Sequence, residues 1–458
     1  MPADRFDVAV LGGGTGGYTA AIRASQLGKR VALVEAAKLG GSCLHVGCIP
    51  TKALLESSGL YHKVSARGQE FGLQADGVAF DYGRIAKRRD GVVEQLHKGV
   101  QGLMRKNKIE VVKAPGRLQG PGAIQAGERT IEAAALIVAT GSAPRSLPGI
   151  EFDGTRIVSS DHAVLAGSLP RSVAIIGGGA IGVEFATFYH QLGIEVTLLE
   201  ALDRLVPLED EEVSRALLQS FTRDGIGCRV GARVEGATVE GDHVHVQLAD
   251  GQLQVEQLLV AVGRRPRTEG IGLEDAGVET DERGFIRVDE WLRTTTPGVW
   301  AIGDAVGGYL LAHAAAHEGI IAVEDIAGER LHPMEQELVT RCTYSTPEIA
   351  SVGLTEAQAR AAGHTVKVGK FPFAANGRAL IHGEPAGFAK LVADADSGQL
   401  LGAHVVGVQA TELIVEPALA RLFQGDAWEV GRNIHPHPTL SEALGEAALA
   451  VAGGAINI

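Results

Sequence analysis

The stretch Phe6–Gly17 reads FDVAVLGGGTGG, an apolar run that meets a cluster of glycines. A short apolar run that ends in glycines predicts a buried strand followed by a tight turn. Residues 18–27 are rich in alanine and are typical of a helix, and residues 29–34 are typical of a second strand that ends in Glu35. This order predicts a βαβ unit whose glycine turn joins the first strand to the helix.

The same order of elements returns later in the chain. Residues 172–176 predict a strand, 183–192 a helix and 195–199 a strand that ends in Glu200. In each copy the acid follows the first glycine of the turn by 23 residues. One GxGxxG match is weak in a chain with 61 glycines, but two copies in the same register indicate a duplicated dinucleotide-binding fold.

Each glycine turn suits a dinucleotide. The first glycine makes the turn, the second lets the backbone approach a pyrophosphate, and the third lets helix and strand pack closely. Free N–H groups at the helix start bind phosphate, and the acid binds ribose hydroxyls. The expected cofactor-binding residues are Gly12, Gly14, Gly17 and Glu35 in the first copy and Gly177, Gly179, Gly182 and Glu200 in the second.

The segment GGSCLHVGCIPTK (residues 40–52) follows Glu35 closely and carries Cys43 and Cys48. On a regular α-helix a step of five residues rises about 7.5 Å, whereas the Cα atoms of a disulfide lie about 4.4–6.8 Å apart. A bond between the two cysteines therefore requires a distorted turn, which Gly47 and Pro50 permit. A strained pair at a helix start favours a redox-active disulfide over two buried thiols or half of a zinc site.

The chemistry of a dithiol assigns the two nucleotides. A dithiol cannot hand a hydride directly to a nicotinamide, whereas a flavin accepts electrons from a thiolate and then releases a hydride. We therefore expect FAD in the fold beside the cysteines and a nicotinamide nucleotide in the second fold. No arginine directly follows Glu200, which favours NAD, although Arg204 is close enough to leave NADP open.

The C-terminal run NIHPHPTLSEA (residues 433–443) carries the candidate acid–base group. His437 precedes Pro438, which stiffens the backbone, and Glu442 follows five residues later at a predicted helix start. A carboxylate fixes the tautomer of an imidazole and raises its basicity, which suits proton transfer to and from thiols. His435 is a weaker candidate because it has no acid at a comparable spacing.

The composition limits the remaining possibilities. A net charge of −13 argues against nucleic acid and anionic membranes as partners, and no apolar stretch is long enough to span a bilayer. Four cysteines are too few for a secreted disulfide framework, and the start of the chain has no signal-peptide pattern, so we expect a cytoplasmic protein. Cys228 and Cys342 are expected to be inert buried thiols, and no metal site is expected.

Further strand-to-glycine segments organise the rest of the chain. Residues 134–139 run into Thr140 and Gly141, residues 258–262 run into Gly263, and each is expected to return the chain to its own sheet. A similar segment, 299–305, precedes a predicted helix, 311–327. The fold class is α/β, with two Rossmann-like dinucleotide-binding domains, one for FAD and one for NAD, and a C-terminal α+β domain. The predicted domains are 1–148 (FAD-binding, with the redox pair), 149–268 (NAD-binding), 269–335 (central, completing the FAD side) and 336–458 (C-terminal).

With these residues in place, the chain resembles the dihydrolipoamide dehydrogenase branch of the pyridine nucleotide–disulfide oxidoreductase family, over essentially its whole length. The resemblance rests on GGSCLHVGCIPTK, both fingerprints, ATGSAPR, VGRRP, AIGDA, LAHAAAHEG, YSTPEIASVGLTE, ANGRA, LLGAHVVG and HPHPTLSEA. Three departures are small: His45 stands where the family usually has Asn, Ser42 where Thr is usual, and Pro436 where Ala is usual. His45 is the one expected to tune the surroundings of the dithiol.

The resemblance implies an activity and partners. Dihydrolipoamide would be oxidised to lipoamide while NAD⁺ is reduced, for a 2-oxoacid dehydrogenase complex or the glycine cleavage system. The family forms homodimers through the C-terminal domain, and each C-terminal histidine serves the dithiol of the partner. The expected protein partner is the lipoyl domain of an acyltransferase or an H-type carrier.

The resemblance also implies a role for each matching residue. Cys43 would be the thiol open to substrate, and Cys48 the thiol against the flavin. Lys52 would lie near the flavin and pair with Glu184, and Asp304 would bind the ribityl chain of FAD. His437, oriented by Glu442, would be the acid–base. Thr140, Gly141 and Gly263 complete the expected cofactor-binding residues.

Two alternatives stay within the flavin disulfide reductases. A mercuric reductase usually carries a C-terminal cysteine pair, which is missing from the last residues, and a glutathione reductase favours NADP through arginines that do not follow Glu200. From other classes, the chain could serve chiefly as an assembly subunit of a larger acyltransferase core. A redox-dead scaffold that binds NADH would require the loss of Cys43, Cys48 or His437, and all three are present.

Overall fold

The computed structural model describes residues 4–74, 77–329 and 332–457. Met1, Pro2 and Ala3, at the start where no signal-peptide pattern is found, lie outside the described residues. The chain divides into two compact units. Unit 1 comprises residues 1–53, 83–145 and 263–334, and unit 2 comprises residues 54–82, 146–262 and 335–458. The boundaries of the four predicted domains remain predictions.

Unit 1 is built on one large sheet in the order β3-β2-β1-β6-β5-β4, in which β17 also pairs with β6. The strands of unit 1, of which β7 and β16 pair apart from the large sheet, are β1 (Asp4–Leu11), β2 (Val31–Glu35), β3 (Glu110–Lys113), β4 (Gly116–Leu118), β5 (Ala123–Ala126), β6 (Arg129–Val138), β7 (Ser142–Pro144), β16 (Arg264–Pro266) and β17 (Val299–Ala301). Its helices are α1 (Thr15–Gln26), α2 (Gly41–His45), α4 (Tyr82–Lys106), η2 (Gly303–Ala305) and α8 (Ala312–Ala327), while α3 (Cys48–Arg67) runs from unit 1 into unit 2. The predicted βαβ unit and the return of 134–139 to its own sheet are confirmed.

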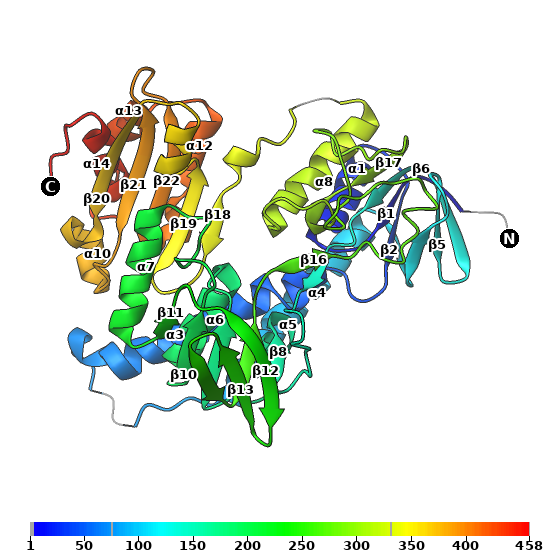
Figure 1. Cartoon of the computed structure of the whole chain (residues 1–458). Coiled ribbons are helices and arrows are strands. Elements are labelled where there is room, and N and C mark those ends of the chain that lie inside the picture. The colour runs from blue at the N-terminus through cyan, green and yellow to red at the C-terminus, as the bar shows by residue number, and fades with distance from the viewer. Residues whose placement is uncertain (1–3, 75–76, 330–331, 458) are drawn as a thin grey trace. The chain divides into compact units, whose positions relative to one another are not determined.

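Both faces of the central strands are covered, which explains their nearly continuous apolar sequence. On one face Val8, Val10 and Leu33 pack against α1 and α8, which lie side by side on the sheet (Figure 1). The two helices approach closely because a Cβ at Gly16 would press on the Ala315 carbonyl and a Cβ at Gly319 on the Gly16 carbonyl.

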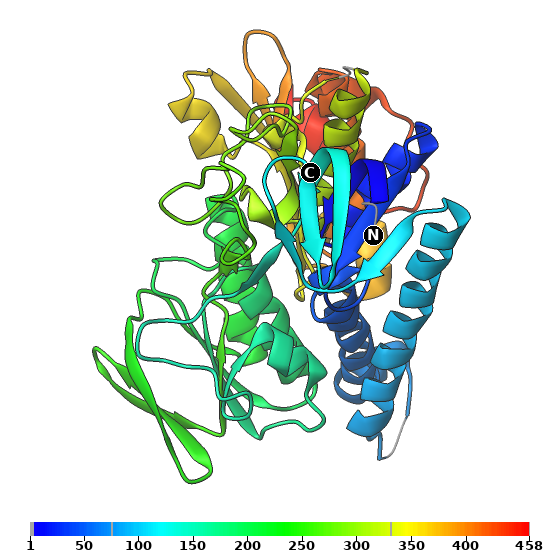
Figure 2. The same cartoon turned by 90° about the vertical axis from the view of Figure 1, so that its right-hand side faces the viewer.

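The first part of unit 2 repeats this plan. A parallel sheet has the order β11-β10-β9-β15-β8, and an antiparallel sheet β12-β13-β14 projects from it (Figure 2). The elements are β8 (Ile157–Ser159), β9 (Ser172–Ile176), β10 (Glu195–Leu199), β11 (Gly227–Arg229), β12 (Val234–Glu240), β13 (His243–Leu248), β14 (Gly251–Val255), β15 (Gln257–Val260), η1 (Gly68–Phe71), α5 (Ser160–Leu165), α6 (Ala180–Gln191) and α7 (Glu211–Asp224). The duplicated βαβ unit is therefore confirmed, with β9, α6 and β10 in the places of β1, α1 and β2.

The second part of unit 2 is an antiparallel sheet in the order β18-β19-β22-β21-β20. Helix α14 packs on β20 and β21, and α12 lies against β22. The elements are β18 (Arg341–Thr343), β19 (Glu348–Gly353), β20 (Val366–Pro372), β21 (Phe388–Asp394), β22 (Leu400–Gly407), η3 (Gln336–Leu338), η4 (Phe373–Ala375), α9 (Glu356–Ala361), α10 (Gly377–His382), α11 (Ala410–Leu413), α12 (Val415–Leu422), α13 (Ala427–Arg432) and α14 (Glu442–Val451). This is the expected C-terminal α+β domain. Within the described residues no helix has the length and apolar character needed to cross a membrane.

Candidate active site

The two glycine turns have the same geometry. Gly12 has φ +111° and Gly177 has φ +107°, and a Cβ at either would collide with a carbonyl oxygen of the neighbouring strand end, Ala139 or Ala261. A Cβ at Gly17 or Gly182 would likewise collide with the carbonyl oxygen of the first glycine of its own turn. Only glycine fits at these four positions, as the fingerprint requires.

The second glycine of each turn, Gly14 or Gly179, is the N-cap of the following helix and provides no side chain to cap it. A Cβ at Gly179 would meet nothing within 4 Å, and one at Gly14 only the Cα of Gly41 at 3.9 Å. The first-turn N–H groups of α1 and α6 are thus uncapped beside open space, which is what a pyrophosphate needs. The residues present therefore fit FAD at the first turn and NAD at the second.

The two strand-end acids bind their turns in matching ways. Glu35 accepts hydrogen bonds from the N–H of Gly13 (2.7 Å) and Ala37 (2.7 Å). Glu200 accepts them from Gly178 (2.6 Å) and Leu202 (2.8 Å). A carboxylate accepts about four hydrogen bonds, so capacity for ribose hydroxyls remains.

Arg204, the residue that left NADP binding as an alternative, binds other groups. Its guanidinium donates to the carbonyl oxygen of Pro207 (3.0 Å) and forms an ion pair with Glu211 (3.2 Å). A 2′-phosphate at Glu200 would have to compete with these partners, so the structure favours NAD.

Cys43 and Cys48 lie on either side of a helix break. Helix α2 ends at His45, α3 begins at Cys48, and a Cβ at Gly47 would press on the backbone of Ser42 and Cys43. The structure holds the pair as two half-buried thiols joined by a hydrogen bond, so their sulfurs lie within reach of each other. The distorted turn expected from the spacing is confirmed.

The environment of the pair favours a thiol at Cys43. Its hydrogen bond with Cys48 and its burial raise the pKa of Cys43, while the charge of Lys52 acts in the opposite direction. Burial raises the pKa of the Tyr18 hydroxyl, and the charge of Cys43 raises it further. Tyr18 therefore also lies close to the pair. Two ionisable sulfurs this close titrate as one coupled pair.

His45, the departure beside Cys43, makes a contact that could not be predicted. Its Nε2 donates to the carbonyl oxygen of Leu39 (2.9 Å), and Nδ1 of His97 donates to the same oxygen (3.0 Å). The two rings meet edge to face with centroids 5.0 Å apart. Burial lowers the pKa of His45, so the neutral ring is favoured behind the cysteine segment.

Asp304 lies in a polar cluster of unit 1. It accepts a hydrogen bond from Ser142, which in turn accepts one from Arg264 (2.6 Å). The next residue back, Gly303, donates its N–H to the buried carboxyl of Glu318 (2.6 Å). Burial, assisted by the charge of Asp304, raises the pKa of Glu318 to about 7.

The three remaining predicted cofactor residues lie at strand ends. Thr140 has a buried Oγ1 with no hydrogen-bond partner among the described residues, which suits a polar group of a bound cofactor. Gly141 has φ +72° and Gly263, which is exposed, has φ +115°. Arg145 donates its N–H to the carbonyl of Gly263 (3.0 Å), and Arg267 donates to Gly141 (2.9 Å).

His437 and Glu442 form the expected pair in unit 2. The Nδ1 of His437 donates to Glu442 (2.8 Å), whose other oxygen accepts the N–H of Thr439 (2.8 Å). The His437 side chain is 80% exposed, so its Nε2 is available to a group outside the described chain. Burial opposes ionisation of Glu442, but the Thr439 N–H and His437 outweigh it and lower its pKa.

One expectation from the sequence needs correction, and another gains a detail. His435 has no acid at a comparable spacing, as expected, but its Nε2 contacts Glu416 of α12 at 2.8 Å, and its side chain is only 7% exposed. The sequence pattern missed this because α12 is distant along the chain and packing alone brings it near. Cys228 and Cys342 are half-buried rather than buried. Burial still raises the pKa of Cys228 to about 11, which keeps that thiol unreactive.

The comparisons with known proteins agree with this geometry. Residues 6–319 match the model of the pyridine nucleotide-disulphide oxidoreductases, and residues 339–448 match the dimerisation domain of the same proteins. The chain belongs to the pyridine nucleotide-disulphide oxidoreductase family.

Relatives within the family are similar over their full length. A dihydrolipoyl dehydrogenase of Bacillus subtilis (strain 168) is 46% identical, covering 99% of this chain and 100% of the relative. One of Thermus scotoductus is 46% identical over 99% of each chain. Among solved structures, LpdA of Mycobacterium tuberculosis has a TM-score of 0.91 at 28% identity, covering 98% of this chain and 100% of that one. The disulfide reductase RclA of Escherichia coli, as a Cu(II) complex, has a TM-score of 0.88 at 28% identity over 98% and 100%.

The predicted site residues of this family member fall into both units. Unit 1 holds the dithiol, Lys52, the first fingerprint and Asp304, whereas unit 2 holds the second fingerprint, His437 and Glu184. Glu184 is buried and accepts the N–H of Tyr344 (2.9 Å), and its pairing with Lys52 remains a prediction. The sequence analysis missed Tyr18, His97 and Glu318. Glu318 carried a signal, since it is an acid inside the apolar helix run 311–327.

Proposed function

We propose that the chain is a dihydrolipoyl dehydrogenase that uses FAD and NAD. One observation of the structure carries this function: Cys43 and Cys48 lie in contact at a helix break that follows β2, the second strand of the first nucleotide-binding unit. The relatives that bear this name support the substrate, because they match over 97–99% of the chain at 41–46% identity. The names of these relatives do not favour glutathione or mercuric ion, the substrates of the two alternative reductases.

The residues of this chain account for the chemistry at sulfur. His437, held by Glu442, takes a proton from a thiol of dihydrolipoamide, and the resulting thiolate attacks Cys43 of the Cys43–Cys48 disulfide. Cys48 leaves as a thiolate. The second substrate thiol then attacks the substrate sulfur bonded to Cys43, and its proton passes to the departing Cys43 sulfur. Lipoamide leaves, and the enzyme retains the Cys43 thiol, the Cys48 thiolate and the two electrons, with the first proton on His437.

The oxidising half of the cycle depends on the two nucleotide turns. FAD bound at the first turn would supply a two-electron acceptor for the dithiol and a hydride donor for NAD⁺. The turn at Gly14 with Glu35 would hold FAD, and the turn at Gly179 with Glu200 would hold NAD. Lys52 would provide a positive charge beside the cysteines that favours a thiolate, and Asp304 and Thr140 would bind the remainder of FAD.

The enzyme is a homodimer, consistent with the dimerisation domain at 339–448. Large apolar side chains of this domain are more than half exposed in the single chain: Val415, Leu419, Leu422, Phe423, Trp428 and Ile434. They lie on α12 and in the segment before His437, and a second copy would cover them. In the dimer, His437 then serves the dithiol of the other subunit.

The protein partner is proposed from the substrate. Lipoamide is carried on a lipoyl domain of an acyltransferase or on an H-type carrier, so the enzyme would serve a 2-oxoacid dehydrogenase complex or the glycine cleavage system. The net charge of −13 and the small number of cysteines suit a cytoplasmic enzyme.

Anaerobic titration of the yellow holoenzyme tests the proposal. Both NADH and dihydrolipoamide are expected to produce a long-wavelength absorption band from the thiolate of Cys48 against the flavin. Cys48→Ser serves as the control, because it should keep FAD and lose the band. A wild-type protein that takes up no flavin, or that gives no band with either reductant, would contradict the assignment.

A further inference from the structure

A polar row crosses the C-terminal sheet. Directly paired positions run from β18 to β20 through all five strands, and cross-strand partners project from the same face of a sheet. The row consists of Arg341, Ser351, His404, Lys390 and Lys370. All but Lys370 belong to the buried residues, which is unusual for charged side chains.

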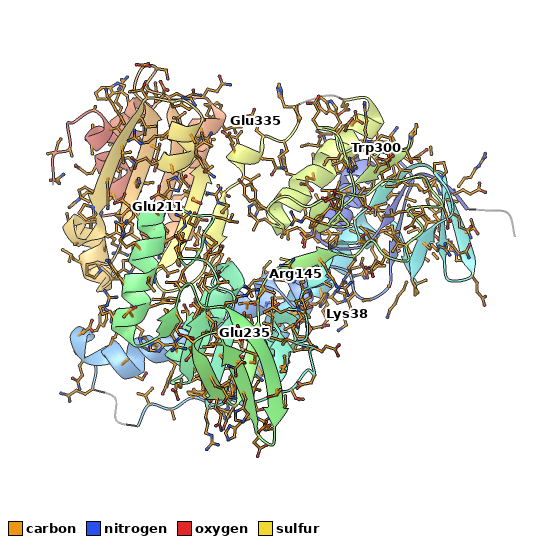
Figure 3. The ribbon with its side chains drawn as sticks, in the orientation of Figure 1. Lys38, Arg145, Glu211, Glu235, Trp300 and Glu335 are labelled. Carbon is orange, nitrogen blue, oxygen red and sulfur yellow. The ribbon has the colours of Figure 1, made fainter. Side chains whose placement is uncertain are left out.

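The row contacts the acidic start of α7, in the nucleotide-binding part of the same unit. Lys390, whose side chain is 2% exposed, contacts both carboxylate oxygens of Asp210 (3.0 and 3.1 Å) and one of Glu212 (2.9 Å). It also contacts Glu356 at the start of α9 (3.0 Å). Arg341 contacts Glu209 (3.3 Å). Figure 3 shows Glu211 at this end of α7, beside the C-terminal sheet.

Asp210 is the key acid of this contact because it also ends the loop that precedes α7. Its carboxylate caps α7 by accepting the N–H of Glu212 (3.1 Å). Burial raises its pKa, but the adjacent His404 and the hydrogen bonds and charge of Lys390 outweigh that effect and leave the pKa lowered. Asp210 therefore stays ionised and remains bound to Lys390 at neutral pH.

The loop before α7, residues 200–210, is the strand-end loop of the second nucleotide turn. At its start Glu200 accepts the N–H of Gly178 (2.6 Å). In its middle Val206 donates its N–H to the carbonyl of Gly178 (2.8 Å). At its end Glu209 donates its N–H to the carbonyl of Val206 (2.9 Å). The loop thus connects the turn residue Gly178 to the acids that the C-terminal sheet holds.

The first nucleotide turn has a position that corresponds to Val206. There Gly40 donates its N–H to the carbonyl of Gly13 (2.8 Å), in the same way that Val206 binds Gly178. The chain then enters α2 and the redox cysteines. In the second copy the corresponding place leads to Glu209 and Asp210. Where the first copy carries the dithiol, the second carries these two acids. Their ion pairs with Arg341 and Lys390 of the C-terminal sheet form the anchor of the loop.

The energetics argue that the anchor fixes position rather than adding stability. Buried ion pairs lose most of their attraction to desolvation, and apolar replacements are often as stable. Three buried polar atoms of this cluster, Glu209 Oε2, Ser351 Oγ and His404 Nδ1, find no partner among the described residues, which adds further cost. A contact with such a cost is retained where a defined geometry is needed.

We propose that Lys390 is a positioning residue of the pyridine-nucleotide site. Through Asp210 it holds loop 200–210 against Gly178, so that Glu200 and the uncapped start of α6 keep the geometry that binds NAD. The inference rests on the proposed function, because it takes the second turn as the NAD site. A residue of the dimerisation domain thereby governs nucleotide affinity without touching the nucleotide.

Lys390→Met in the FAD-loaded dimer tests this role. The variant is expected to weaken NADH binding about tenfold or more, the scale at which small displacements of binding groups act. Its FAD content and the extent of flavin reduction by dihydrolipoamide should equal those of the parent. Lys370→Met is the matched control: Lys370 lies in the same row and contacts Glu212 (2.7 Å) but not Asp210, so NADH affinity should change less than about twofold.

Asp210→Asn changes the acid that Lys390 contacts and keeps a good N-cap for α7. This variant provides the test if Lys390→Met does not fold. It should weaken NADH binding in the same selective way. Unchanged NADH affinity in the folded variants, or equal losses of NADH binding and of reduction by dihydrolipoamide, would overturn the positioning role. A parent enzyme that binds no NADH would instead contradict the proposed function.

Discussion

At the scale of single residues, two histidines of one loop have opposite environments. The side chain of His437 is 80% exposed and donates to Glu442, whereas that of His435 is 7% exposed, paired with Glu416 and packed against Gly445. A catalytic base needs a free nitrogen that substrate can reach, and a structural histidine needs partners on both sides. This contrast in exposure supports the proposal that His437 is the acid–base and that His435 has a packing role.

His437→Ala is expected to lower lipoamide turnover about 10²-fold, the usual scale of acid–base catalysis, because it removes the proposed proton acceptor. FAD content and thermal stability should stay at the parent level. His435→Ala should do the reverse and lower the free energy of unfolding by about 1–3 kcal/mol, since it removes the packed imidazole and leaves the half-buried Glu416 with Asn433 as its remaining side-chain donor. Steady-state kinetics and thermal melts of both variants measure the contrast, and near-normal turnover in His437→Ala would remove its role.

Glu318 gives a prediction for the pH dependence of stability. Its pKa is raised from 4.5 to about 7, so its neutral form is favoured in the folded state. The resulting stabilisation is complete below about pH 4.5 and is lost as the pH rises through 7. Glu318→Gln keeps an acceptor for Gly303 and stays neutral. Its melting temperature relative to the parent should therefore rise between pH 5 and pH 8, by the equivalent of up to about 3 kcal/mol. A difference independent of pH would show that Glu318 does not titrate in this range.

At the scale of elements, the two strand–turn–helix units are separate copies of one motif. Each uses a first glycine with positive φ, a third glycine that touches the first, and an acid that binds the turn. Because the two copies lie in different sheets, damage to one should leave the other intact.

The third glycines allow this independence to be tested. Gly17→Ala would place a methyl group on the carbonyl of Gly12, so FAD should no longer be retained and the purified protein should be colourless. Gly182→Ala creates the same clash in the second copy and should give a yellow protein that binds NADH weakly. Gly99→Ala in α4, where a Cβ meets nothing within 4 Å, is the control and should be neutral or stabilising by about 1 kcal/mol. Loss of flavin from Gly182→Ala would show that the copies are coupled.

At the scale of the whole molecule, the proposed acid–base and the redox dithiol belong to different units of the chain. His437 faces outward on a domain whose neighbouring surface is apolar, and the dithiol lies in the other unit. A second copy would both cover the apolar residues and bring the missing acid–base to each dithiol.

Leu419→Glu combined with Phe423→Glu is expected to separate the dimer, because each places a charge in the covered surface. Sedimentation should show half the parent mass. Lipoamide turnover should fall about 10²-fold, since His437 no longer meets a dithiol, while NADH should still reduce the flavin. Val239→Glu on β12, an exposed apolar residue outside the C-terminal domain, should leave the mass unchanged. A monomeric variant with full lipoamide turnover would refute the shared site.

Much of the molecule follows from the sequence because the governing interactions are local. The glycine turns, the strand-end acids and the break between Cys43 and Cys48 depend on sterics within a few residues or within one βαβ unit, so spacing and residue type predict them. The pair His437–Glu442 is local in the same sense. Glu318, His97 and the true partner of His435 are different, because their neighbours come from distant segments.

The sequence by itself therefore determined the two nucleotide turns, the reactive cysteine segment and the family. Only the tertiary structure decided which charged residues are buried and which partners they meet, such as Lys390 with the Asp210 carboxylate, or Glu318 with the N–H of Gly303. The physical reason is that a turn depends on the covalent geometry of its own residues, whereas the state of a charge depends on burial and on partners that packing brings from elsewhere.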